Sequence, residues 1–187
     1  MAGDFRATLR RVKPGKRFTR LTRRNAAELP FLHSLTDVPR KLLYDTTVYI
    51  DILQDRFPRD WDFVLRAADA WHSPVTEMEL AVSCAALDPG DRRTAAAIET
   101  IAAVLDQRPA YRTIAPDLEI WREAGLLTGV LARLQGYGAG DRYRVFSDAL
   151  LFCTARKYGL TVLSRNLKDF DLLQQLDPSG RVVFYNV

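Results

Sequence analysis

Four acidic residues are spaced along the chain so that their carboxylates could act together: Asp45, Glu79, Asp148 and Asp169. Asp45 and Glu79 each follow a strand-like segment, Asp148 opens a helix-like segment, and Asp169 comes after a polar turn behind a further apolar run. In an α/β protein, groups at strand ends and helix starts converge on one edge of the sheet. The spacing therefore predicts a divalent-metal site.

The chemistry gives a reason for such a cluster. Two carboxylates about 5 Å apart repel each other by roughly 3 kcal/mol at an effective dielectric near 20. Mg²⁺ or Mn²⁺ offsets this repulsion, takes oxygen ligands, and keeps waters that can reach a phosphate. Such an ion lowers the pKa of an attacking water and stabilises charge on the scissile phosphate. The only histidines are His33 and His72, and neither is paired with a plausible nucleophile, which disfavours a Ser-His or Cys-His hydrolase.

Each acid also has a purely structural explanation. Asp45 could cap a helix, and Glu79 stands three residues after Thr76, as in a capping box. Asp148 near a helix start is favoured by the helix dipole, and Asp169 could stabilise a turn. Capping alone does not explain why four acids lie at element ends that share one sheet edge, so the set together favours a site.

The chain alternates strand-like and helix-like patterns. Strands are predicted at 41–44, 73–75, 111–114, 161–163 and 182–185, and helices at 48–53, 60–71, 77–87, 98–105 and 117–134. Such alternation implies parallel strands with helices on both faces. We therefore predict an α/β fold, a three-layer α/β/α sandwich with a central, mainly parallel sheet. The glycine-rich segment 136–140 is predicted to be a flexible loop, not a dinucleotide site, because it follows a helical pattern.

Charge divides the chain into two parts. The net charge is +4, but the first 40 residues carry ten basic side chains against three acidic ones, so the remainder is mildly acidic. We predict a basic N-terminal extension, 1–40, before one domain, 41–187. The extension could follow a phosphate backbone, or it could be a solvated tail. No stretch is apolar enough for a membrane span or a signal peptide, and the two cysteines lack disulfide spacing, which predicts a cytoplasmic protein.

Four motifs resemble those of PIN-domain nucleases, most of all the VapC-type toxins: 43–46, 73–80, 147–151 and 164–170. The resemblance implies a Mg²⁺-dependent endoribonuclease that forms a homodimer and is inhibited by a cognate antitoxin. It also implies an acidic quartet of Asp45, Glu79, Asp148 and Asp169, supported by Thr46, Ser164 and Asn166. The basic segment before the first strand departs from the family, whose members typically begin almost at once.

These observations predict metal-dependent hydrolysis of RNA, with Asp45 and Asp148 as the main metal ligands. Arg142, Arg144 and Arg165 are candidates to hold the RNA backbone together with the basic extension. Two alternatives remain within the same fold: a nucleic-acid-binding or regulatory module without turnover, and a nuclease of RNA processing. An enzyme that acts on a small phosphorylated molecule is disfavoured because no glycine loop could cradle a phosphate.

Overall fold

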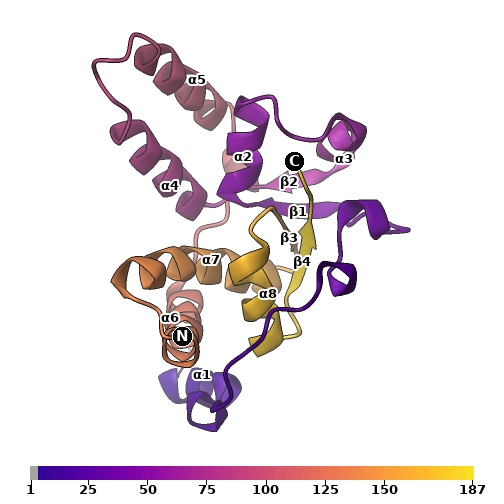
Figure 1. Cartoon of the computed structure of the whole chain (residues 1–187), viewed down its shortest axis with the longest axis vertical. Helices are drawn as coiled ribbons and strands as arrows, with labels where there is room; N and C mark the ends of the chain where they lie inside the picture. Colours follow the sequence, from indigo (N-terminus) through magenta and orange to yellow (C-terminus); the bar gives the residue numbers. More distant parts are fainter. Residues whose placement is uncertain (1–3) are drawn as a thin grey trace.

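A computed structural model describes residues 4–187 of the chain, and a four-stranded parallel sheet lies at its centre (Figure 1). The strands run in the order β2-β1-β3-β4. Their bounds are β1 Lys41–Tyr44, β2 Asp69–Trp71, β3 Thr161–Ser164 and β4 Arg181–Phe184. The helices are α1 Phe5–Val12, α2 Thr46–Leu53, α3 Asp62–Ala67, α4 Pro74–Ala85, α5 Thr94–Asp106, α6 Leu118–Gln135, α7 Ala139–Lys157 and α8 Leu167–Leu176.

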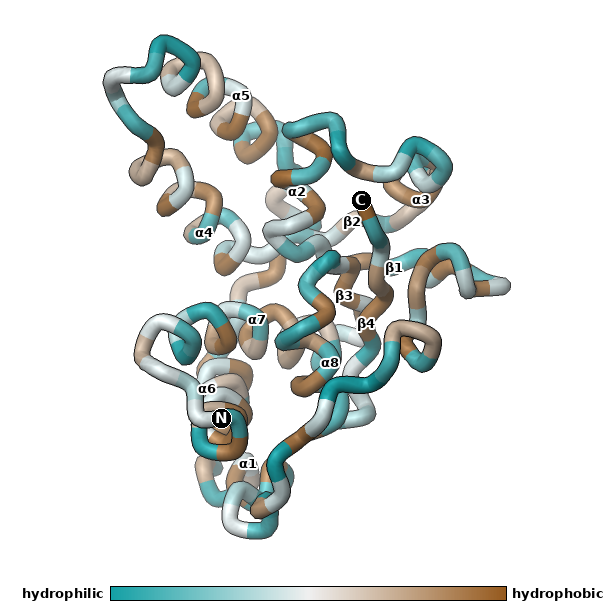
Figure 2. The backbone as a smooth tube through the Cα atoms, viewed as in Figure 1, coloured by the Kyte–Doolittle hydropathy of each residue, from teal (hydrophilic) through white to brown (hydrophobic). Residues whose placement is uncertain are grey.

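Side chains of the short strands alternate between two apolar layers. Leu43 and Val162 face a core that is shared with α6, α7 and α8, whereas Leu42 and Leu163 face a second core that is shared with α2 and α3. This period of two follows from the pleat of each strand. Figure 2 shows the hydrophobic strands enclosed by amphipathic helices. The predicted three-layer α/β/α sandwich with a parallel sheet is confirmed.

The N-terminal segment packs on the body of the protein. Helix α1 lies against α6, and Val12 at its end is buried. Further along, Leu29 and Phe31 are buried, and Phe31 forms a parallel bridge with Phe184 of β4. Residues 4–40 thus add apolar contacts to the core, while residues 1–3 of the predicted extension lie outside the described range.

Two predicted strands are wrong. Segment 73–75 begins α4, because Ser73 is the N-cap, its Oγ accepting from the Val75 N–H at 3.2 Å, and Pro74 occupies the first turn. The real strand is Asp69–Trp71, inside the region predicted as a helix over 60–71, and its pairing with β1 overrides that local pattern. Segment 111–114 contributes only an isolated bridge, between Thr113 and His72, next to a 3₁₀ turn.

The glycine-rich segment is not a long loop. Gly136 adopts a left-handed conformation with φ of 71° and ends α6, and Gly138 is the N-cap of α7, whose first residue is Ala139. Helices α6 and α7 are therefore joined by a tight turn. No helix within residues 4–187 has the length and apolar character needed to cross a bilayer.

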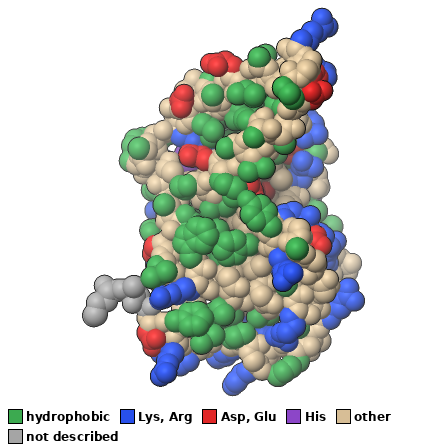
Figure 3. All heavy atoms as spheres, turned by 90° about the vertical axis from the view of Figure 1, so that its left-hand side faces the viewer, with side chains coloured by type: hydrophobic (Ala, Val, Ile, Leu, Met, Phe, Trp, Pro, Cys, Tyr) green, Lys and Arg blue, Asp and Glu red, His purple; other side chains and the backbone are tan. Residues whose placement is uncertain are grey.

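Helices α4 and α5 form a hairpin that projects from the body (Figure 1). Its residues include the exposed side chains of Met78, Val82 and Ile98, and no residue of α5 is buried. Figure 3 shows hydrophobic side chains gathered over this hairpin and over the centre of the same face. An apolar face of this kind is typical of a protein-binding surface.

Candidate metal centre

The site lies at the topological switch point of the sheet, between β1 and β3. Strand β1 has β2 on one side and β3 on the other, so the carboxyl ends of β1 and β3 flank the switch point. Crevices at such points are the usual ligand sites of open parallel sheets. Asp45 follows β1 directly and its N–H donates to the Leu163 carbonyl at 3.1 Å, while Ser164 ends β3 beside it.

A chain of hydrogen bonds fixes the side chains at this edge. The hydroxyls of Ser164 and Thr47 donate to Oδ2 of Asp45 at 2.6 and 2.7 Å. Ser164 Oγ accepts from the Asn166 N–H at 2.8 Å, and Asn166 Nδ2 donates to Oδ2 of Asp148 at 2.9 Å. Asp45 and Asp148, 103 positions apart in sequence, are thus joined through Ser164, the last residue of β3, and Asn166, two positions later. Ser164 and Asn166 both take part in this chain of hydrogen bonds, and their supporting role stays a prediction.

Two of the acids do not sit at element ends. Glu79 lies in the middle of α4, and Asp148 is the middle residue of α7, so neither opens a helix and the capping explanations for both are wrong. Thr76 donates instead to the Tyr44 carbonyl at 3.3 Å. Thr46, which follows Asp45, donates to Glu79, and Asn166, which follows β3, donates to Asp148, so both mid-helix carboxylates lie in the same pocket. Asp169 is in the first turn of α8, and its N–H donates to Asn166 Oδ1 at 3.4 Å.

A pocket of about 320 Å³ opens over these groups. Its lining includes Asp45, Glu79 and Asp148, and also Thr46, whose hydroxyl donates to Glu79. Asp169 lies outside the lining, although its charge acts on Asp148. The remaining lining residues are Thr47, Ile50, Met78, Val82, Ser83, Tyr143, Arg144 and Asn166. Met78, Val82 and Tyr143 carried no chemical signal in the sequence, because an apolar wall is visible only once the helices are packed.

Burial raises the pKa of the three carboxyl groups that line the pocket. At Asp148 burial is the largest cause, followed by repulsion from Asp45, Asp169 and Glu79, and the pKa lies well above its ordinary value. At Asp45 burial outweighs the hydrogen bonds from Ser164 and Thr47, which lower the pKa. Burial likewise raises the pKa of Glu79. The three groups therefore favour protons or a cation over three bare charges.

The buried acids of the protein differ in whether an arginine neutralises their charge. Six acidic residues of the described chain are buried, and four of them have an arginine partner: Asp51, Glu123, Asp169 and Asp171. Asp45 and Asp148, 3% and 5% exposed, have no ion pair within 4 Å with any residue from 4 to 187. Arg144 pairs with Asp169 at 3.2 Å and lowers the pKa of Asp148 through space.

The donor chemistry of this pocket fits a hard divalent cation. Carboxylates and hydroxyls supply oxygen ligands only, and the two buried acids without arginine partners leave negative charge to be offset. Over residues 4–187, no group of three or more acidic, histidine or cysteine side chains converges closely enough to enclose an ion. Among the cations that such ligands accept, Mg²⁺ commonly takes one or two carboxylates and keeps several waters.

The three candidate arginines differ in their surroundings. Arg144 lines the pocket and also pairs with Asp141 at 2.9 Å. The guanidinium of Arg165 is directed to the buried Asp51, with Nε 2.7 Å from Oδ2, and does not line the pocket. Arg142 is exposed on α7 and is likewise outside the lining. Asp51 itself was not foreseen, since an acid inside an apolar helix pattern does not reveal its partners.

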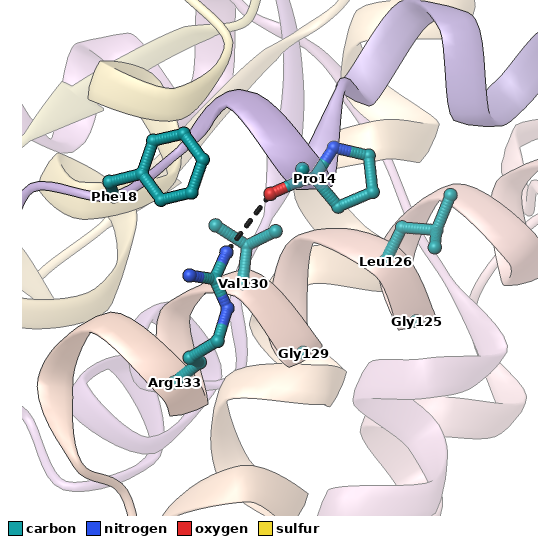
Figure 4. Close-up of a pocket in the computed structure, with 8 residues that line it drawn as sticks. Pro14, Phe18, Gly125, Leu126, Gly129, Val130 and Arg133 are labelled. Atoms are coloured by element: carbon teal, nitrogen blue, oxygen red, sulfur yellow. Dashed lines mark hydrogen bonds between the residues drawn. The ribbon is translucent and has the colours of Figure 1, made fainter.

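A second pocket, of about 370 Å³, lies between α6 and the turn after α1 (Figure 4). It is lined by Pro14, Phe18, Val130 and small residues of α6, and its only charged lining residue, Arg133, donates to the Pro14 carbonyl at 3.0 Å. The lining of this pocket contains none of the predicted site residues.

Comparison with known proteins gives a fold match. No family model and no curated sequence matches the chain. Among solved structures, a chain of FitAB bound to an IR36 DNA fragment aligns with TM-score 0.53 and 20% identity, covering 77% of this chain and 94% of that one. A chain of VapBC2 from Rickettsia felis, bound to a DNA fragment from its promoter, gives 0.54 and 13%, covering 78% and 98%.

A third match is VapBC-5 from Mycobacterium tuberculosis, a member of the VapBC family of toxin-antitoxin systems. It aligns with TM-score 0.50 and 23% identity, covering 80% of this chain and all of that one. Identities at this level carry the fold and not the chemistry. The chain shares the α/β fold of chains that build VapBC and FitAB complexes, in agreement with its resemblance to VapC-type PIN domains.

Proposed function

We propose that this chain is a Mg²⁺- or Mn²⁺-dependent endoribonuclease that hydrolyses RNA phosphodiester bonds, the toxin component of a toxin-antitoxin pair. One observation carries the proposal. Asp45 and Asp148 are the two buried acids that the described chain leaves without an arginine, and both line the pocket at the switch point of the sheet. Buried charge without a partner is costly unless a cation is bound.

Asp45 and Asp148 would hold the metal, and their neighbours orient them. The Ser164 and Thr47 hydroxyls donate to one oxygen of Asp45, and Asn166 Nδ2 donates to one oxygen of Asp148, so the other oxygen of each carboxylate has no side-chain donor among residues 4–187. A bound divalent ion supplies Lewis-acid chemistry, lowering the pKa of a water and offsetting charge on a phosphate. Fixed orientation of its ligands keeps the site organised before substrate arrives.

Glu79 and Asp169 complete the acidic quartet in different ways. Glu79 is half-buried with a raised pKa and accepts from Thr46, so it is suited to hold a proton at the mouth of the pocket. Asp169 binds Arg144 and thereby positions that guanidinium at the pocket, where it can contact a substrate phosphate.

The exposed apolar surface of the α4–α5 hairpin is the proposed binding surface for a protein partner. Its exposed Val82 and Met78 continue from the pocket wall onto the surface, so a protein that covers the hairpin would also restrict access to the carboxylates. An antitoxin bound here would inhibit the enzyme, and a second copy of the chain is the other proposed partner. The VapBC and FitAB complexes to which the fold is similar make a protein partner a natural expectation.

The test is cleavage of a mixed structured RNA pool by purified protein with Mg²⁺, with Mn²⁺ and with EDTA, beside an Asp45→Asn control. We expect cleavage that requires metal and is lost in the variant. RNA binding without cleavage under every condition would refute the nuclease and favour a regulatory nucleic-acid-binding module of the same fold. If cleavage is found, a neighbouring gene for a small DNA-binding protein would separate a toxin from an RNA-processing enzyme.

A further inference from the structure

A basic pocket of about 590 Å³ lies between the N-terminal segment and α8, next to the proposed metal centre. Three cations line it: Arg20 and Arg23 from the N-terminal segment and Lys168 from α8. Its other lining residues are Leu21, Thr22, Gln135, Tyr137 and Leu172, so no acidic side chain contributes to the lining. A concave surface with three positive charges and no negative one attracts an anion.

The backbone that carries the two arginines is anchored on both sides. Gln135 Nε2 donates to the Leu21 carbonyl and Gln175 Nε2 to the Thr22 carbonyl, each at 3.0 Å. The Arg24 N–H donates to Oδ2 of the buried Asp171 at 3.0 Å, and its Nε donates to Oδ1 at 2.6 Å. Arg20 and Arg23 thus extend from a fixed segment and not from a loose tail.

The three lining cations are not neutralised by the protein. Within residues 4–187, none of them has a carboxylate within 4 Å, in contrast to Arg24, which is used as the anchor. Arg20 Nε donates only to the neutral Gln135 at 3.4 Å, and the Lys168 ammonium lies 5.8 Å from the centre of the Tyr137 ring. Their full charge is available to a ligand.

Asp169 links this basic pocket to the pocket of Asp45 and Asp148. Lys168 directly precedes Asp169, and Tyr137 Oη donates to Oδ1 of Asp169 at 3.5 Å. The other oxygen of Asp169 accepts from Arg144 Nε, and Arg144 lines the pocket of Asp45 and Asp148. The two pockets therefore lie on either side of the Tyr137–Asp169–Arg144 contact, and each has at least one arginine in its lining.

We propose that this basic pocket, defined by Arg20, Arg23 and Lys168, binds the phosphate backbone of the RNA strand that is cut at the carboxylates. The inference rests on the proposed nuclease function and assigns a substrate-binding role to the N-terminal segment. Fixed cations provide contacts to successive phosphates, and the Tyr137 ring provides an aromatic face for a base. An acidic peptide would use the same charges but would gain nothing from the neighbouring phosphodiester site.

The test compares Arg20→Ala/Arg23→Ala with the parent protein, both carrying Asp45→Asn so that bound RNA stays intact. The readout is fluorescence anisotropy of a labelled single-stranded RNA of about 12 nucleotides, titrated at several salt concentrations. Loss of two phosphate contacts should reduce the slope of log affinity against log salt by about 1.4, since each contact in a single strand contributes about 0.7. Arg20→Lys/Arg23→Lys should retain the parent slope, because its charge is unchanged.

The matched control is Arg59→Ala/Arg66→Ala, which removes two exposed arginines near α3, far from the basic pocket (Figure 1). This control should leave the slope unchanged, and every variant should melt within about 2 °C of its parent. An unchanged slope for Arg20→Ala/Arg23→Ala would overturn the inference, as would displacement of the RNA by a poly-glutamate peptide as readily as by unlabelled RNA. Cleavage of the same RNA by protein with Asp45 intact reports separately on the nuclease itself.

Discussion

Two sets of buried acids in this protein differ in what surrounds them. Asp51, Glu123 and Asp171 each contact at least one arginine, and Asp51 also accepts from Tyr185 Oη at 2.8 Å. Asp45 and Asp148 contact only neutral donors. Both sets are buried. They differ because the first set has arginine partners, whereas the second set has no cation partner among residues 4–187.

Under the proposed function, this difference separates structural acids from metal-binding ones. An arginine partner offsets the cost of burying a carboxylate and ties distant segments together, as Arg24 ties the N-terminal segment to α8 through Asp171. Even so, burial outweighs Arg156 and Arg11 at Glu123, whose pKa is raised. At Asp45 and Asp148 hydrogen bonds and the distant charge of Arg144 offset only part of the cost, because no cation of residues 4–187 forms an ion pair with either acid, and a bound metal ion would offset more of it.

The largest expected effect comes from removing an acid of the unpaired set. Asp45→Asn should lower metal-dependent RNA cleavage by about 100-fold or more, because one charged ligand of the proposed ion is replaced by a neutral amide. Cleavage rates with Mg²⁺ and with Mn²⁺ measure the effect. Wild-type activity in the variant would place the chemistry elsewhere in the molecule.

Two matched substitutions, one in each set of buried acids, test this difference through the free energy of unfolding. Asp171→Asn removes the partner of Arg24 and should lower the free energy of unfolding by about 1–3 kcal/mol. Asp148→Asn should leave the metal-free protein as stable or more stable, because it removes one member of a crowded anionic site. Urea denaturation in EDTA measures both. A clear loss of stability in Asp148→Asn would instead make that residue a structural acid.

Metal binding should stabilise the folded protein through the unpaired acids alone. At a Mg²⁺ concentration about 100 times the dissociation constant, mass action adds about 2.7 kcal/mol to the free energy of unfolding. The resulting rise in melting temperature should be retained in Asp171→Asn and lost in Asp148→Asn. An equal rise in both variants would indicate that the ion binds away from the pocket.

The smallest effect is a pH dependence. Because the pKa of Asp148 in the folded protein lies well above its ordinary value of 3.8, the folded state binds more protons than the unfolded state between these two values. Metal-free stability should therefore increase as the pH falls through the folded-state pKa, and the contribution levels off below the ordinary value. Unfolding in EDTA from about pH 4 to about pH 8 should show a shallower slope for Asp148→Asn. Equal slopes would argue against a raised pKa.

Local sequence was sufficient for some elements and misleading for others. The apolar runs of β1, β3 and β4 and the periodic helices α5 and α6 lie close to their predicted positions, because burial on both faces or on one stripe leaves a clear pattern. β2 was missed, since a three-residue strand with one charged residue has no such pattern and exists only through its pairing with β1.

Sequence alone determined the kind of chemistry that this chain could carry: four acids, their polar neighbours, and a basic N-terminal segment, all visible as residue types in order. Tertiary structure decided which of these groups meet. Asp148 and Glu79 reach the site from the middle of α7 and α4, because the packing of these helices against each other and against the rest of the fold brings both residues into one pocket. Packing alone also decided which buried acids have an arginine partner. The partners are far apart in sequence, and only the folded chain brings them into contact.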